Sequence, residues 1–89
     1  MRSVALTGRF KRDYRRTLKA DPDIDAILGP IIEILVSGAP LAPNHHDHAL
    51  SGNWRGYRDC HIRPDLLLIY SRTAEVVTLV RLGSHSDLF

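Results

Sequence analysis

The sequence has no long hydrophobic run and only one cysteine. No apolar stretch approaches the roughly 18 to 20 residues that a helix needs to cross a bilayer. The N-terminus turns charged, from Arg2 to Arg9, before an apolar run long enough for a signal peptide can develop. Cys60 alone cannot form an intramolecular disulfide and fits a reducing compartment. We therefore expect a cytoplasmic protein that is not associated with a membrane.

Other absences narrow the class of protein further. A chain of 89 residues supports one hydrophobic core, so we expect a single domain over residues 1–89, and no repeat, low-complexity segment or linker suggests a second module. Cys60 is predicted as a small apolar residue on a strand, which argues against thiol chemistry. The net charge of +2 is too small to indicate nucleic-acid binding by itself.

The N-terminal half predicts a short strand followed by two helices. Residues 4–6 form the candidate strand, and Thr7 can cap a helix over about residues 8–20, where aromatic and aliphatic side chains recur every four residues. Asp21 followed by proline resembles the start of a second helix with a broad apolar face. Pro30 predicts a kink or a break in that helix, and Gly38 predicts its end.

Basic side chains gather on one face of the first predicted helix. The spacing of three and four residues places them together, and the face is either an ordinary solvated surface or an electrostatic footprint for RNA or an acidic partner. The residues are Arg9, Arg12, Arg16 and Lys19.

The C-terminal half predicts three antiparallel strands, at about residues 54–62, 66–70 and 76–81, with short turns between them. Residues 84–89 would form a short C-terminal turn of helix or coil. Together with the N-terminal strand and the helical hairpin, this predicts an α+β two-layer fold with the helices on one face of the sheet.

The histidines are the candidate catalytic residues of this fold. In a meander with short turns, His61, Asp65 and His85 fall at one common end of the sheet, and His48 can reach it through the preceding loop. Histidine can act as acid or base near neutrality, because its unperturbed pKa is about 6.5. Guanidinium groups such as those of Arg58 and Arg81 suit a phosphate. The combination predicts acid–base cleavage of RNA.

Simpler interpretations of the same residues stay open. Any one histidine can be a surface residue, and residues 45–48 could form a metal site, although adjacent histidines in a loop cannot all ligate from one rigid face. Trp54 and Tyr57 either stack on bases or belong to the core on a strand that faces the second helix. Phe89 is either a frayed terminus or a stacking partner for a nucleotide.

Two segments carry a resemblance to a known family. His48–Tyr70 reads HxLSGxWxGYRDCHIxPDLLLIY, and the chain ends RLGSHSDLF from Arg81. Together they resemble the YafQ branch of the RelE/ParE toxin superfamily, over roughly residues 4–89. The resemblance implies a RelE-like fold and an mRNA endonuclease of a type II toxin–antitoxin system that cuts codons in the ribosomal A site. One departure is Leu66, where this branch often carries tryptophan.

The resemblance also implies roles and partners. Its catalytic residues fall on His48, His61, Asp65, His85 and Phe89. His85 and His48 would serve as acid and base, Asp65 would orient a histidine or act as base, His61 and Arg81 would stabilise the phosphate, and Phe89 would position a base. No cofactor or metal is implied.

The implied partners are the ribosome, mRNA and a cognate antitoxin, usually of the ribbon-helix-helix DinJ or RelB kind, which masks the basic surface. Operator DNA would be bound only through the antitoxin complex. The alternative function is that of a ParE-like or inactive relative that acts only by binding a protein. Three histidines at one sheet edge argue against it, because a pure binder has no need of them.

Overall fold

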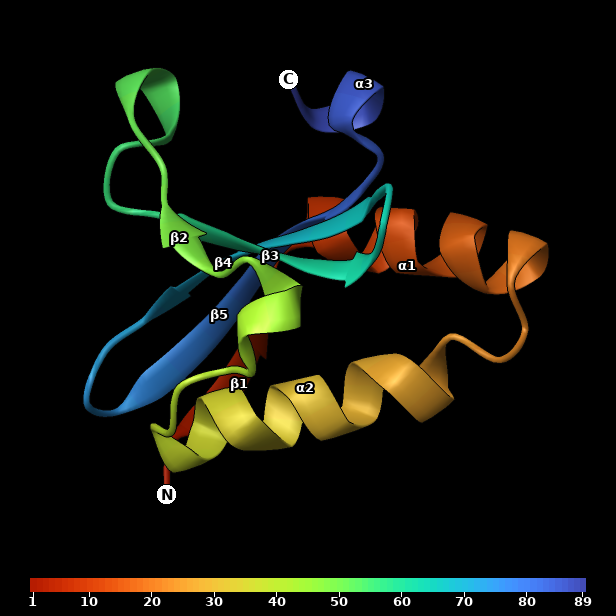
Figure 1. The fold of residues 1–89 in the computed structure, drawn as a ribbon. Helices are drawn as coiled ribbons and strands as arrows, with labels where there is room; N and C mark the ends of the chain where they lie inside the picture. Colours follow the sequence, from red (N-terminus) through yellow and green to blue (C-terminus); the bar gives the residue numbers. More distant parts are fainter.

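The computed structural model describes all of residues 1–89, and Figure 1 shows a central sheet with helices packed against it. Helices α1 and α2 lie on one side of the sheet. The loop around residues 50–57 and the C-terminal helix α3 rise on the other side (Figure 1). The strands are β1 (Ser3–Leu6), β2 (His48–Ala49), β3 (Arg58–Arg63), β4 (Leu66–Arg72) and β5 (Val76–Gly83); the helices are α1 (Gly8–Ala20), α2 (Asp25–Ser37) and α3 (His85–Leu88), with 3-10 turns at Pro43–His45 and Gly52–Trp54.

The sheet has five strands in the order β1-β5-β4-β3-β2. Strands β3, β4 and β5 form the predicted antiparallel meander. The predicted N-terminal strand is β1, which adds to β5 in parallel, and β2, which was not predicted, adds two residues to the other edge. A parallel neighbour needs a long connection, and the chain between β1 and β5 contains α1 and α2 as well as β2, β3 and β4.

Local signals account for α1. Thr7 has an extended backbone, and its side-chain oxygen accepts a hydrogen bond from the Phe10 amide at 3.0 Å, which confirms the predicted N-cap. The helix spans Gly8–Ala20, as predicted. The Thr7 hydroxyl also donates to the carbonyl of Val80 in β5 at 2.8 Å. The N-cap residue therefore joins the start of α1 to β5.

Helix α2 differs from the prediction at two points. It begins at Asp25 and has no side-chain cap, so Asp21 does not start it. Instead the Asp21 carboxylate accepts from Arg63 at 2.6 Å. The helix is also unbroken at Pro30, which lies in its interior. Proline leaves the Ala26 carbonyl without its amide partner, and this costs little because Ala26 is exposed.

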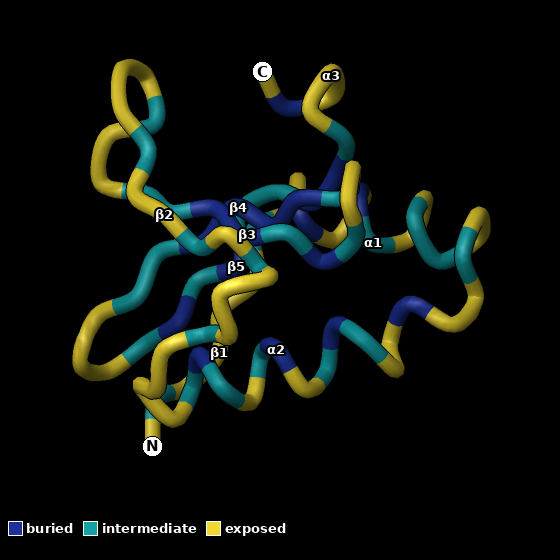
Figure 2. The backbone as a smooth tube through the Cα atoms, in the orientation of Figure 1, coloured by how far each residue is buried: buried dark blue, intermediate teal, exposed yellow.

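The core is divided between the two faces of the sheet. The larger cluster lies between the helices and the sheet, where buried strand residues meet Phe10 of α1 and the apolar face of α2. Figure 2 shows buried residues along the strands and on the sides of α1 and α2 that face the sheet. Strand β4 is buried on both faces, as predicted, since Leu68 and Tyr70 face the helices while Leu67 and Ile69 face away from them.

The segment before β3 is a loop, which corrects the prediction of a strand from residue 54. Residues 52–54 form a 3-10 turn, and β3 begins only at Arg58. Trp54 and Tyr57 pack edge to face, with ring centroids 5.6 Å apart, in the smaller cluster with Leu67, Ile69 and Leu88. They therefore cover the sheet face opposite α2, whereas the sequence placed them toward it.

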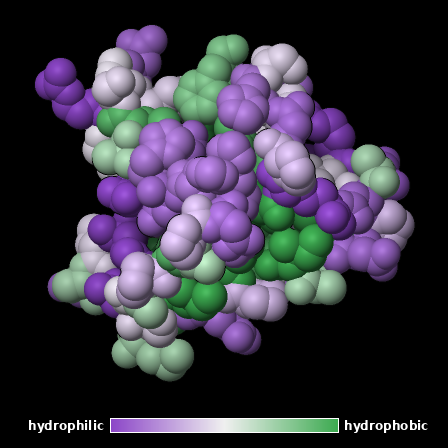
Figure 3. Space-filling model, in the orientation of Figure 1, coloured by the Kyte–Doolittle hydropathy of each residue, from purple (hydrophilic) through white to green (hydrophobic).

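The surface is uneven in polarity. In Figure 3 hydrophobic side chains are visible in the region between α1 and α2, and hydrophilic ones cover much of the rest of this view. None of the helices combines the length and the apolar character required to cross a bilayer.

Candidate functional site

The turn between β3 and β4 and the start of α3 bring His61, Asp65 and His85 together. Asp65 lies in the two-residue turn after Arg63, and its Oδ1 accepts hydrogen bonds from the His85 ring Nδ1 at 2.7 Å and from the His85 amide at 3.1 Å. The His61 and His85 rings meet edge to face with centroids 5.6 Å apart. The meander therefore places these three residues at one end of the sheet, as its topology predicts; their catalytic role stays a prediction.

Helix α3 is short, and its start is fixed by its own residues. The Ser84 side chain accepts from the Asp87 amide at 3.2 Å, and the Asp87 carboxylate accepts from the Ser84 amide at 3.1 Å. This reciprocal capping box satisfies two amides that would otherwise lack partners. Because His85 is the first residue of α3, the capping box also fixes the direction in which its ring leaves the chain.

Strand β2 adds His48 to the same face. His48 lies opposite Asp59 in the β2–β3 ladder, and Asp59 is two residues before His61, so both point to one face of β3. Residues directly opposite in neighbouring antiparallel strands share a face. Since Asp59 is opposite Ile69 and His61 is opposite Leu67, this is the face that carries the smaller cluster, away from the helices.

Asp59 is the buried acid of the site, and the sequence analysis missed it. It is 3% exposed, and its Oδ1 receives no hydrogen bond although His48 Nδ1 lies 3.2 Å away. Burial raises the pKa of the Asp59 carboxyl, and the positive charge of His48, His61 and His85 opposes that rise. The alternation of β3 could have identified Asp59, because it shares its face with His61.

Hydrogen bonds select the tautomers of His48 and His85. His48 Nδ1 is 2.7 Å from the His46 carbonyl oxygen, which can only accept, so Nδ1 carries the proton and Nε2 is free to accept one. Hydrogen bonds from the His85 ring and amide lower the pKa of Asp65, so its carboxylate accepts from His85 Nδ1–H. Both rings thus present Nε2 to the open side of the site, where more than half of each side chain is exposed.

Arg81 is not free to bind a phosphate, in contrast to its predicted role. Its Nε donates to Asp13 of α1 at 2.7 Å, and the Leu82 amide donates to the same carboxylate at 3.0 Å. The Arg81 side chain is only 13% exposed and that of Asp13 only 5%. Burial alone would raise the pKa of Asp13, but the hydrogen bonds from Arg81 and Leu82 outweigh it and lower the pKa. Arg81 therefore joins α1 to β5.

Arg58 also lies outside the histidine site. It is opposite Tyr70, on the face of the sheet that packs against the helices. Its Nε donates to Asp47 at 3.3 Å, and the Tyr70 hydroxyl donates to the same Asp47 oxygen at 2.7 Å. The guanidinium thus holds the loop before β2; its side chain is still 40% exposed, and its contact with RNA stays a prediction.

Phe89 and Leu66 differ in how far their side chains are exposed. Phe89 is 59% exposed, and its amide donates to the His85 carbonyl at 2.9 Å, so its ring is available beside the site. Leu66 is partly buried against the larger cluster and faces the helices. Its contacts with the core account for an aliphatic side chain at this position.

The basic face of α1 is present as predicted. Arg9, Arg12 and Lys19 are exposed and have no carboxylate partner, whereas Arg16 donates to Asp13 at 3.2 Å and remains 61% exposed. A shallow pocket lined by Arg16, Ser84 and Asp87 among others joins this face to the start of α3. Arg16 of the basic face therefore borders the same pocket as the start of α3, together with the acidic side chains of Asp21 and Asp87.

The surroundings of Cys60 and of the histidines at residues 45–48 bear on the thiol and metal alternatives. Burial raises the pKa of the Cys60 thiol to about 12, so it stays protonated at neutral pH. His, Cys, Asp and Glu side chains form no group of three that is placed to hold a metal ion. In the segment considered above as a metal site, His45 Nδ1 donates to the His61 carbonyl at 2.9 Å and His48 Nδ1 donates to the His46 carbonyl.

Comparison with known proteins identifies relatives over the whole chain. The mRNA interferase toxin YafQ of Escherichia coli K12 is 32% identical over 88 residues, which cover 99% of this chain and 96% of the relative. A copper-bound mutant toxin from Helicobacter pylori superposes with a TM-score of 0.94 at 40% identity, with 100% of both chains covered. The E. coli DinJ–YafQ complex contains a chain with a TM-score of 0.89 at 33% identity, covering 100% of this chain and 99% of that one.

A family model gives the same assignment. The model described as bacterial toxin of type II toxin–antitoxin system, YafQ, matches residues 2–89. That span includes all three helices, the whole sheet and every residue of the histidine site. The chain therefore belongs to the YafQ family of bacterial toxins of type II toxin–antitoxin systems.

Proposed function

We propose that this protein is an endoribonuclease that cleaves mRNA in the ribosomal A site and so stops translation. The observation that carries the proposal is the arrangement of His48, Asp59, His61, Asp65 and His85 on one sheet face. Cleavage of RNA by its own 2′-hydroxyl needs a base, an acid and groups that stabilise the charged phosphorus centre. The name mRNA interferase of the E. coli relative supports the same activity.

In the proposed reaction His48 is the base. Its Nε2 is unprotonated in the tautomer that the His46 carbonyl selects, and it takes the proton of the 2′-hydroxyl. The 2′-oxygen then attacks phosphorus, the bond from phosphorus to the 5′-oxygen breaks, and a 2′,3′-cyclic phosphate forms. The Asp59 carboxylate lies 3.2 Å from His48 Nδ1, on the side of the ring away from the reacting Nε2.

His85 is the acid that protonates the departing 5′-oxygen. Asp65 accepts from Nδ1, stabilises the imidazolium and directs Nε2–H outward, the role a carboxylate plays in other His–Asp pairs. The His61 ring lies 5.6 Å from the His85 ring and can donate to the phosphate, the task that the sequence also assigned to Arg81. Phe89 stays proposed as a stacking surface for a base.

The test is cleavage of a defined mRNA by purified toxin, with and without programmed ribosomes, read by primer extension. We expect cuts within the A-site codon only when ribosomes are present. Folded toxin free of antitoxin that leaves the message intact under both conditions would contradict the proposal and favour a function by protein binding alone.

The basic face of α1 is proposed to bind ribosomal or messenger RNA. Replacing Arg9, Arg12 and Lys19 together by glutamine removes three unpaired positive charges. We expect affinity for programmed ribosomes to fall by about tenfold or more at 0.15 M salt, and the salt dependence of binding to become shallower, since fewer counterions are released. Fluorescence anisotropy of labelled toxin across a salt series measures both.

The matched control keeps the charge and changes the shape: Arg9→Lys, Arg12→Lys and Lys19→Arg in one variant. It should bind with nearly the wild-type salt dependence. Equal affinity and equal salt slopes for the glutamine variant and the wild type would show that this face is only a solvated surface.

The partner is proposed to be a cognate antitoxin. The E. coli relative is solved as a DinJ–YafQ complex. An acidic segment would suit the unpaired cations of α1. A ribbon-helix-helix part of such an antitoxin, of the DinJ or RelB kind, would bind operator DNA on behalf of the complex. Because translating ribosomes are cytoplasmic, the free toxin is proposed to act in the cytoplasm.

A further inference from the structure

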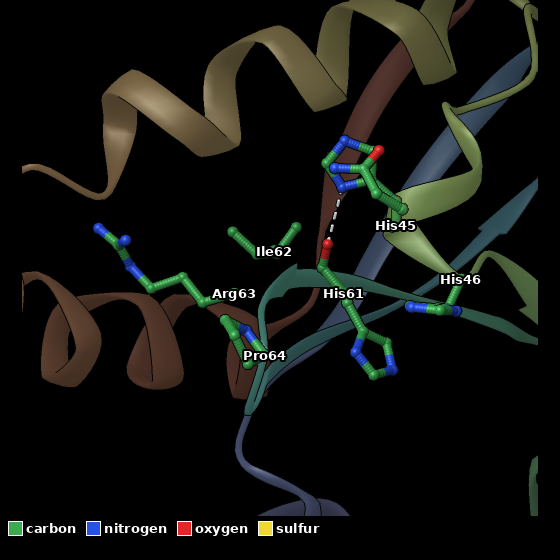
Figure 4. A pocket seen from close by; sticks show the side chains of 7 residues that line it. His45, His46, His61, Ile62, Arg63 and Pro64 are labelled. Carbon is green, nitrogen blue, oxygen red and sulfur yellow. Dashed lines mark hydrogen bonds between the residues drawn. The ribbon is translucent and has the colours of Figure 1, made fainter.

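A pocket of about 460 Å³ adjoins the histidine site on the side away from His85. The turn that precedes β2 forms one wall with Asn44, His45 and His46, and the end of β3 with the residues after it forms the other (Figure 4). His61 belongs to both this pocket and the site, because its ring lies 5.1 Å from the His46 ring and 5.6 Å from the His85 ring. An RNA chain held at His61 and His85 would continue past His46 into the pocket.

The walls of the pocket are held in place without a ligand. The His45 ring donates to the His61 carbonyl at 2.9 Å, which fastens the turn to the open edge of β3 beyond the two residues that pair with β2. Arg63 on the opposite wall is held by Asp21 at 2.6 Å. His46 has a positive φ of 48°, a left-handed conformation that turns the chain back toward His48. Figure 4 shows the ring of His46 beside the His61 side chain.

The lining has the chemistry of a nucleotide site. Only one of its seven residues is hydrophobic, and the volume falls in the range of about 300–1,000 Å³ usual for small-molecule sites. The imidazole of His46 offers a flat face for stacking, and single-stranded RNA is commonly read by stacking on such rings. The Asn44 side chain is exposed and makes no internal hydrogen bond, so its amide can both donate to and accept from a base edge.

We propose that this pocket binds the nucleotide that flanks the scissile phosphate, with His46 stacking on its base and Asn44 contacting the base edge. The inference rests on the proposed function and adds a specificity site to it. Sequence preference at one position of the codon then originates in the turn at residues 43–46. Asn44 and His46 are specificity residues and take no part in proton transfer.

The experiment measures cleavage on ribosomes programmed with a set of messages that carry each of the four bases at each A-site position. The variants are Asn44→Ala, which removes the amide, and His46→Asn, which tolerates the left-handed backbone but lacks the ring. We expect Asn44→Ala to reduce the ratio between the best and the worst base at one position by about tenfold. We expect His46→Asn to raise KM by about tenfold through lost stacking.

Asn53→Ala is the matched control, because Asn53 is an exposed amide in the next loop, between β2 and β3, and outside the pocket. It should retain the wild-type preference and KM. Asn44→Ala and His46→Asn variants that match this control would overturn the subsite while leaving the nuclease intact. Wild-type toxin that cuts none of the messages would instead overturn the proposed function, and the subsite with it.

Discussion

Replacement of His85 by alanine is expected to lower the rate of mRNA cleavage on ribosomes by about a hundredfold to ten-thousandfold, the usual contribution of a general acid. The ring removed is the one whose Nδ1 is held by Asp65 at 2.7 Å, and it is the proposed donor of the proton to the departing 5′-oxygen. Single-turnover primer extension on saturating programmed ribosomes measures the chemical step directly. Ribosome binding should remain, because the basic face of α1 is untouched.

Three further variants make that result specific. Asp65→Asn keeps the shape but removes the negative charge that accepts from His85 Nδ1–H, so the rate should fall, though less than in His85→Ala. His48→Ala should also lose activity, because it removes the proposed base. Asn53→Ala should cleave normally. A His85→Ala toxin that cleaves at the wild-type rate would disprove the assignment of the acid.

Replacement of Asp13 by alanine is expected to lower the free energy of unfolding by about 3–5 kcal/mol, the usual result of breaking a buried ion pair. Asp13 is 4% exposed, and its loss leaves the Arg81 guanidinium and the Leu82 amide without partners. Domains of this size are stable by only about 5–15 kcal/mol, so the effect is a large part of the total. Urea denaturation followed by circular dichroism measures it.

The same carboxylate predicts a pH dependence of stability. Its pKa is lowered in the folded protein, so the folded state releases this proton more readily than the unfolded state, where the ordinary value is 3.8. The stabilisation is therefore complete above that ordinary pKa and is lost as the pH falls through the lower, folded pKa. The difference in unfolding free energy between wild type and Asp13→Asn should be full at about pH 7 and shrink below about pH 4.

The control for this titration is Asp23→Asn, which changes an exposed aspartate that has no ion-pair partner. Its effect on stability should be small and nearly independent of pH. A difference between wild type and Asp13→Asn that stays constant across the acid range would mean that the Asp13 charge does not hold β5 to α1.

The sequence was sufficient wherever the signal is local. Thr7 before an amphipathic segment defined α1 to the residue, and short turns between apolar strands implied the meander of β3, β4 and β5. Antiparallel neighbours joined by a short turn must bring the end of one strand beside the start of the next. That rule alone placed Asp65 near His61 and His85, and the resemblance to YafQ toxins followed from the same residues.

Contacts between distant residues were decided only by the tertiary structure. Asp13 and Arg81 are separated by 68 positions, and nothing near either one indicates that they pair. The parallel addition of β1, the face covered by Trp54 and the commitment of Arg58 to Asp47 are of the same kind.

The physical reason is that a side chain's capping, turn and alternation preferences depend on its near neighbours, whereas its ion-pair partner depends on which surfaces meet after collapse. Sequence therefore determined the elements of this protein and the end of the sheet where its histidines gather. The tertiary structure determined which of the predicted RNA-binding arginines have a carboxylate partner: Arg58 pairs with Asp47, and Arg81 and Arg16 pair with Asp13.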